Sequence, residues 1–236
     1  MPPTVGLAII GDEVLLGEVA DENLAWIAAE LFRIGAELRY CCVLPDEMNF
    51  LVEHLKWMRG RFDWVMTTGG IGATHDDLTR RAVGKVTGRA LEENEAAVRL
   101  LEERLGKPLP RRIRELAVFP SGSELVSNPV TAAPGFIVDN MIILPGIPDL
   151  VRKMFPVLEE RLSGRERMSR RELLTECYES QIAEMLEEAQ GLFPDVKIGS
   201  YPELGKDHYR VRLVLRSGNE EILDTALTYL RRRLER

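Results

Sequence analysis

The chain has 236 residues, of which 45% are hydrophobic and 29% charged, and its formal net charge is -7. This length suits one large domain plus a small one, and the composition is that of a globular protein rather than a disordered or fibrous chain. The acidic balance excludes a protein whose main role is to coat nucleic acid or an anionic membrane, because that role needs a basic surface.

The sequence also disfavours a membrane-spanning protein and a protein stabilised by disulfides. No apolar run is long enough to span a membrane, and the start of the chain lacks the basic residues of a signal peptide. The three cysteines, Cys41, Cys42 and Cys177, form neither a CxxC pair nor an even-numbered disulfide framework. We therefore expect a cytoplasmic protein with no membrane and no nucleic-acid partner.

The first two-thirds of the chain alternates short apolar runs with helical patterns, which is typical of βαβ units in a mostly parallel sheet. Strands are predicted at residues 5–10, 38–44 and 63–67. Helices are predicted from Leu24 to Ile34, with Gly35 just past the end, and through Phe50 to Met58, with Asp46 as a candidate N-cap.

The third strand leads into a glycine-rich loop, Thr67 to Thr79, and the apolar spacing predicts a helix starting near Asp76. Glycines 69, 70 and 72 let the backbone approach an anion, and the helix offers its N-terminal N–H groups. A tight strand-to-helix turn would also explain the glycines. The neighbouring hydroxyls and the two carboxylates, Asp76 and Asp77, favour a phosphate site, in which a carboxylate either caps the helix or holds a cation. The spacing is neither that of a Walker loop nor GxGxxG.

Helices at about 92–105 and 111–117 follow, and then a hairpin from 136 to 144 turns at Asp139-Asn140. A further helix begins near Pro148. The polar stretch 163–169 predicts a boundary between a domain at 1–165 and a second at 169–236. The second domain has β-α-β-β-α order, which suits a small α+β fold with helices on one face of an antiparallel sheet.

Polar residues also follow the other predicted strands, at the ends where open α/β sheets bind ligands. The first strand leads into Gly11 to Gly17, with Asp21 to Asn23 opening the next helix, and the second leads into Pro45-Asp46-Glu47. Asp21 and Asp46 could each be only an N-cap.

The chain contains the motifs GDEVLLGEVADEN (11–23), TTGGIGATHDDLT (67–79), NPVTAAPGF (128–136) and LPGIPDLVRKMF (144–155). Together these four motifs resemble the amino-terminal part of the competence/damage-inducible protein A (CinA) family, and they occur in the family's order. That part is a molybdopterin-binding-type domain, similar to the molybdopterin adenylyltransferases (MoaB/MogA-like) and to the extra domain of some eukaryotic FAD synthases. The small second domain also resembles the one that follows in that family.

The resemblance implies a three-layer α/β/α domain with a mostly parallel sheet, and metal-dependent hydrolysis of the pyrophosphate bond of ADP-ribose or a similar dinucleotide. Asp77 and Asp46 match the acidic residues that act with a divalent metal (Mg, Mn or Co), so both are expected to be catalytic and metal-binding. The expected partners are a nucleotide or pterin phosphate ligand and a second copy of the chain in a homodimer. The nicotinamide-nucleotide amidase domain that often follows has no counterpart here, so no amidase activity is expected. The expected ligand-binding residues are Gly11, Asp12, Glu13, Gly17, Asn23, Thr68, Gly69, Gly70, Gly72, Thr74, Asp76, Thr79, Asn128, Gly135, Pro145 and Gly146.

Three functions remain open from the sequence: a nucleotide pyrophosphatase, a molybdopterin-handling adenylyltransferase or pterin-binding protein, and a non-catalytic nucleotide sensor or scaffold. The second domain favours the competence branch, because the adenylyltransferases usually lack it.

Overall fold

A computed structural model of the chain describes residues 2–164, 167–203 and 210–235. The chain divides into two compact units, Met1–Gly164 and Arg165–Arg236, each with a hydrophobic core of its own. Within the described residues no helix is long and apolar enough to cross a membrane.

The first unit is built on a six-stranded sheet with the order β2-β1-β3-β8-β7-β6. The first four of these strands are mutually parallel, whereas β7 runs antiparallel to both of its neighbours. The apolar runs predicted as strands supply the buried centre of the sheet. In chain order the strands are β1 (Thr4–Ile10), β2 (Glu37–Leu44), β3 (Trp64–Thr68), β6 (Glu124–Val126), β7 (Gly135–Val138) and β8 (Met141–Leu144).

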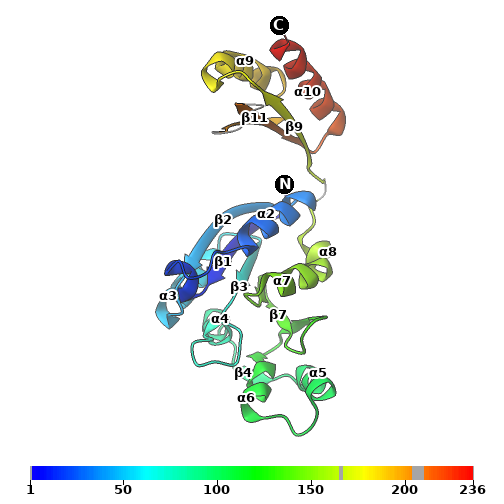
Figure 1. Cartoon of the computed structure of the whole chain (residues 1–236). Helices are drawn as coiled ribbons and strands as arrows, with labels where there is room; N and C mark the ends of the chain where they lie inside the picture. The colour runs from blue at the N-terminus through cyan, green and yellow to red at the C-terminus, as the bar shows by residue number, and fades with distance from the viewer. Residues whose placement is uncertain (1, 165–166, 204–209, 236) are drawn as a thin grey trace. The chain divides into compact units, whose positions relative to one another are not determined.

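Helices cover both faces of this sheet, which gives three layers (Figure 1). One face packs against α3 (Met48–Arg59), α4 (Thr79–Thr87) and α5 (Glu95–Leu105), through residues such as Leu55 and Val83. The other packs against α2 (Asn23–Arg33), α7 (Pro148–Met154), η2 (Phe155–Leu158) and α8 (Glu159–Leu162), through residues such as Leu31 and Met154. The predicted α/β fold with a mostly parallel sheet is confirmed.

Short elements complete the first unit. A turn of helix, α1 (Asp12–Leu15), follows β1, and a two-stranded ribbon pairs β4 (Leu91–Glu93) with β5 (Val118–Pro120). Between the strands of this ribbon lie α5, α6 (Arg111–Arg114) and η1 (Glu115–Ala117).

The second unit is the small α+β domain that the sequence predicts. Its three-stranded antiparallel sheet has the order β10-β11-β9, formed by β9 (Ser169–Thr175), β10 (Lys197–Pro202) and β11 (Val211–Ser217). One face packs against α9 (Glu179–Leu192) and α10 (Glu220–Leu234), and Leu213, Leu215 and Leu223 lie in that core. Asn219 caps α10 by accepting a hydrogen bond from the Ile222 N–H.

Candidate functional site

A cavity of about 700 Å³ lies where β1, β3 and β8 end. Its lining includes Gly11 after β1, Gly69 to Gly72 after β3, and Pro145 to Pro148 after β8. Backbone bonds tie these exits to neighbouring strands, since the Gly11 N–H donates to the Leu44 carbonyl and the Gly69 N–H to the Leu144 carbonyl, each at 3.1 Å. The cleft therefore sits at the strand ends where open α/β sheets bind ligands.

The floor of this cleft is made of backbone without side chains. Gly69 has φ +100°, and a Cβ there would lie 2.0 Å from the Ile10 carbonyl oxygen. A Cβ on Gly70 would lie 2.2 Å from the Thr79 Oγ1, and one on Gly146 would lie 3.3 Å from the Gly69 Cα. Glycine is required because two backbone segments meet here.

Asp77 shapes the loop by accepting three hydrogen bonds. They come from the Gly72 N–H at 2.5 Å, the Thr74 N–H at 2.8 Å and the Thr74 Oγ1 at 2.5 Å. The expected helix start near Asp76 is wrong by three residues, because α4 begins at Thr79 and its first turn has no side-chain cap. Asp77 therefore caps the loop and not the helix.

Arg80 holds the same loop from its other side. This side chain is buried, with 9% of its surface exposed, and its guanidinium donates to the carbonyls of Ile71 and Gly72 at 2.5 Å each. Burial lowers the pKa of Arg80, and the charges of Asp77 and Glu115 oppose that shift. The guanidinium of Arg80 therefore holds the carbonyls of the loop, and the carboxylate of Asp77 holds its amides.

Two loop amides remain available for a ligand. Gly70 and Ile71 both line the cleft, and neither N–H donates to a protein acceptor within the described residues. Adjacent backbone N–H groups after a strand form an anion-binding concavity.

Asp46 lies in the same cleft, in an acidic environment. The Asp12 N–H donates to its Oδ2 at 3.1 Å, and the Asp46 N–H donates to the Asp12 Oδ1 at 3.2 Å. Its Oδ1 is buried and accepts no hydrogen bond from the described residues. Burial, followed by the charges of Asp12, Glu13 and Asp76, raises the pKa of Asp46, and the backbone hydrogen bond from Asp12 opposes them. Asp46 is not the helix cap that we considered, since Glu47 precedes α3 and no side chain caps that helix.

The predicted site residues divide into two groups. The cleft is lined by Gly11, Glu13, Asp46, Gly69, Gly70, Gly72, Asp76, Asp77, Asn128, Pro145 and Gly146. The expected ligand-binding residues that do not line it are Asp12, Gly17, Asn23, Thr68, Thr74, Thr79 and Gly135.

Most residues of the second group support the cleft from behind. The Asn23 Nδ2 donates to the Gly146 carbonyl at 2.7 Å, and the Thr79 Oγ1 donates to the Gly69 carbonyl at 3.0 Å. Thr68 is buried within β3, and Gly135 is buried at the start of β7, where a Cβ would lie 2.6 Å from the Ile143 carbonyl. Asn128, although it lines the cleft, uses its amide to hold its own loop through Thr131 and Ala133.

Sequence reasoning missed the apolar part of the lining and Arg80. Val19, Leu116 and Ile147 lie at the cleft, and Val19 and Ile147 are 52% and 59% exposed. Exposed apolar side chains beside a polar loop indicate a binding site, but only the folded structure shows that they are exposed and close to that loop. In the sequence, Arg80 follows Thr79 and looks like an ordinary surface residue of a helix, so nothing there indicates that it is buried.

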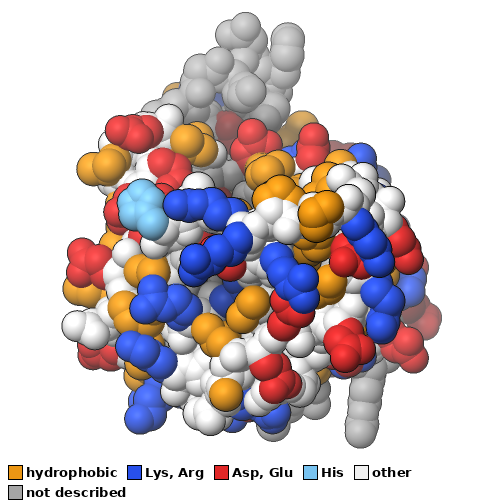
Figure 2. Space-filling view, turned by 90° about the horizontal axis from the view of Figure 1, so that it is seen from below, with side chains coloured by type: hydrophobic (Ala, Val, Ile, Leu, Met, Phe, Trp, Pro, Cys, Tyr) orange, Lys and Arg blue, Asp and Glu red, His pale blue; other side chains and the backbone are white. Residues whose placement is uncertain are grey.

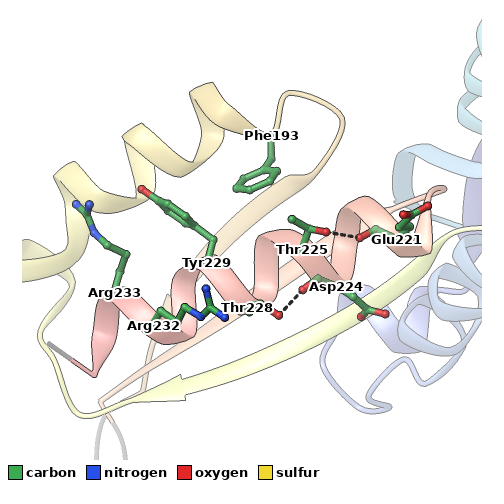
Figure 3. Close-up of a pocket in the computed structure, with 8 residues that line it drawn as sticks. All are labelled: Phe193, Glu221, Asp224, Thr225, Thr228, Tyr229, Arg232 and Arg233. Carbon is green, nitrogen blue, oxygen red and sulfur yellow. Dashed lines mark hydrogen bonds between the residues drawn. The ribbon is translucent and has the colours of Figure 1, made fainter.

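The face of the molecule seen from below in Figure 2 is not uniformly acidic. Figure 2 shows Lys and Arg side chains mixed with Asp and Glu on the face seen from below. A second hollow of about 740 Å³ lies on α10 of the other unit, beside Phe193 and Tyr229 (Figure 3). That hollow contains no glycine loop, so the cleft of the first unit is the candidate site.

The first unit is a three-layer α/β domain with a glycine loop and carboxylates at the ends of its strands. These features define an α/β protein with an open sheet of the kind that binds ligands at its strand ends. The model of the "Probable molybdopterin binding domain" family matches residues 6–163, and the chain belongs to this family. The model of the "FAD synthase, middle domain" matches residues 167–236.

Known relatives support this assignment. A protein of Archaeoglobus fulgidus is 33% identical over 196 residues, which cover 83% of this chain and 84% of that protein. A "Putative competence-damage inducible protein" of Clostridium botulinum is 32% identical over 90% of this chain but only 54% of its own length. The crystal structure of the protein CinA, with unknown function, from Thermoplasma acidophilum matches 68% of this chain and 98% of its own, with 26% identity and a TM-score of 0.64. The resemblance to the CinA family is confirmed.

Proposed function

We propose that the cleft binds a phosphorylated, nucleotide-like ligand and that the protein hydrolyses the pyrophosphate bond of ADP-ribose or a similar dinucleotide. The observation that carries this proposal is the backbone floor, where the amides of Gly70 and Ile71 have no acceptor among the described residues and lie in the same cleft as the half-buried carboxylate of Asp46. The floor lets phosphate oxygens approach the amides closely, and such preorganised donors stabilise charge that develops on phosphorus.

The remaining lining suits the rest of such a ligand. Val19, Leu116 and Ile147 offer apolar contact to a flat ring, while the Asp77 and Arg80 contacts keep the loop amides in place before the ligand arrives. An apolar pocket with a few convergent polar groups is the usual form of a small-molecule site.

The two carboxylates expected to hold a divalent cation fit it unequally. The Oδ1 of Asp46 accepts no hydrogen bond from the described residues, so a cation would give it a partner. The charges of Asp12, Glu13 and Asp76 contribute to raising the pKa of Asp46, and a cation would offset them. Both carboxylate oxygens of Asp77 already accept loop hydrogen bonds. Mg²⁺ is commonly held by one or two carboxylates plus the ligand's phosphates, which fits a region where no cluster of three acidic, His or Cys ligands occurs among the described residues. When bound, such a cation would neutralise charge on the phosphate oxygens. We therefore assign Asp46 as the main candidate ligand of a divalent cation.

A second candidate function is binding or adenylylation of molybdopterin, which the description of the matching family favours. The same amides would then hold the pterin's phosphate. The match of residues 167–236 to a further domain favours the first proposal, because the adenylyltransferases usually lack that domain.

The decisive experiment measures thermal shifts and AMP release with ADP-ribose, FAD and molybdopterin, each with and without Mg, Mn or Co. We expect metal-dependent release of AMP from ADP-ribose, and its loss in Asp46→Asn. Asp195→Asn, which makes the same change at an exposed position of the second unit, should remain active. A shift with molybdopterin and no turnover would favour the second candidate, and no response to any of these compounds would refute both.

We also propose a homodimer, because most soluble oligomers are symmetric and dimers are the commonest. A solution mass of 26.7 kDa by light scattering, the mass of one chain, would contradict it.

A further inference from the structure

The sheet of the second unit has one face covered by helices and one face that they leave open. On β11, Val211, Leu213 and Leu215 pack in the core under α9 and α10, so Arg212 and Arg216 project to the opposite side. The strand register places three rows across this open sheet face, Lys197–Arg216–Arg170, Gly199–Val214–Glu172 and Tyr201–Arg212–Leu174.

An aromatic ring lies flat on this face. A Cβ on Gly199 would be 2.9 Å from Cε2 of Tyr201, so the ring covers Gly199, and 39% of Tyr201 stays exposed. The guanidinium groups of Arg212 and Arg216 lie 5.3 and 6.0 Å from the ring centroid. The Arg216 Nη2 also donates to the Tyr201 hydroxyl at 3.3 Å.

The face is positively charged, although the chain as a whole is acidic. Arg170 and Arg212 share the carboxylate of Glu172, and Arg212 also contacts Glu203. Neither Lys197 nor Arg216 has a carboxylate within ion-pair distance among the described residues. Many of the acidic residues of this unit lie instead on the two helices, for example Glu187 and Asp224. The open sheet face is therefore more basic than the net charge of the sequence indicates.

We propose that the open sheet face binds single-stranded nucleic acid. Lys197 and Arg216 supply cations for phosphates, and Tyr201 supplies a surface on which a base can stack, a combination that sheet-based single-strand binders use. A duplex is disfavoured because its bases are already stacked and cannot reach the ring. This face belongs to the second unit and the cleft belongs to the first, and the present proposal does not depend on the function proposed for the cleft.

The test uses the full chain and fluorescence anisotropy with a labelled strand of about 12 deoxythymidines. We expect tighter binding to the single strand than to a duplex of equal length. Tyr201→Ala should weaken binding about tenfold, and Arg216→Gln should weaken it less and lower the salt dependence by about one counterion. Arg232→Gln, which removes the same charge from α10 (Figure 3), serves as the matched control and should bind like the wild type.

Circular dichroism of each variant separates loss of binding from loss of fold. The proposal is overturned if no binding occurs at about 50 mM salt, or if folded Tyr201→Ala and Arg216→Gln bind as the wild type does. It is also overturned if Arg232→Gln weakens binding as much as Arg216→Gln, or if the face instead pairs two copies of the chain, seen as a dimer that Tyr201→Ala dissociates.

Discussion

Asp77 offers the sharpest test of how the glycine loop is held. Asp77→Asn keeps one oxygen that can accept a hydrogen bond and replaces the other with an NH₂ group, so the bond from the Gly72 N–H or the pair from Thr74 is lost. A hydrogen bond to a charged group contributes about 1.5–3 kcal/mol. Because this carboxylate is partly exposed, solvent reduces that contribution, and we expect a loss of about 1–2 kcal/mol in the free energy of unfolding.

For a unit of this size, the loss corresponds to a fall of about 3–6 °C in the melting temperature. The amides of Gly70 and Ile71 would also be less well ordered, so the affinity for ADP-ribose should fall about tenfold. Differential scanning calorimetry and isothermal titration calorimetry on the same preparation measure both effects.

Asp76→Asn is the matched control, since its side chain is 61% exposed and accepts none of these three loop bonds. It should melt like the wild type. If Asp77→Asn also melts and binds like the wild type, the loop does not depend on this carboxylate. If it keeps stability and affinity but loses turnover, Asp77 acts in the chemical step instead.

Three further predictions concern the loop contact of Arg80, the backbone floor at Gly69 and the buried thiol of Cys41. Arg80→Met should leave the carbonyls of Ile71 and Gly72 without their donors and lower the free energy of unfolding by about 2 kcal/mol, with Arg80→Lys less affected; urea unfolding that shows no loss would contradict the clamp. Gly69→Ala should cost at least about 3 kcal/mol, because its Cβ meets the Ile10 carbonyl, whereas Gly17→Ala has open space and should cost about 1 kcal/mol; similar melting temperatures would argue against the backbone floor. Burial raises the pKa of Cys41 to about 11, so its alkylation by iodoacetamide should stay slow until the pH approaches that value. As pH rises from about 9 to about 11, the thiol ionises in the unfolded chain before it does so in the folded protein, so the free energy of unfolding should fall over this range. Rapid alkylation of Cys41 at neutral pH would contradict a raised pKa.

Elements that bury a regular apolar pattern could be predicted from the sequence. β1, β2 and β3 follow from their apolar runs, and α2 follows from its helical spacing and from Gly35, which has φ +76°. Strands β5 and β6 were missed because each has only three residues, which is too short for a period-two pattern to appear.

The cleft was predictable in position but not in its internal bonds. The glycines and carboxylates identify the strand ends, since parallel strands bring their exits to one edge. The role of Asp77 was not predictable, because its donors at Gly72 and Thr74 face it only after the loop has folded. The same holds for Arg80, whose burial depends on carbonyls eight and nine positions earlier in the chain.

The backbone floor of the cleft has a consequence for how such proteins can diverge. Gly69 lies against the backbone of both Ile10 and Gly146. Any larger residue at position 69 would push apart the strand ends that meet there. Selection for a new ligand is therefore expected to act on the rim, at positions such as Val19, Leu116 and Ile147, while the backbone floor of the cleft stays constant. A fold of this kind can change the ligand that it binds through a few apolar side chains at the rim, with no change in its sheet.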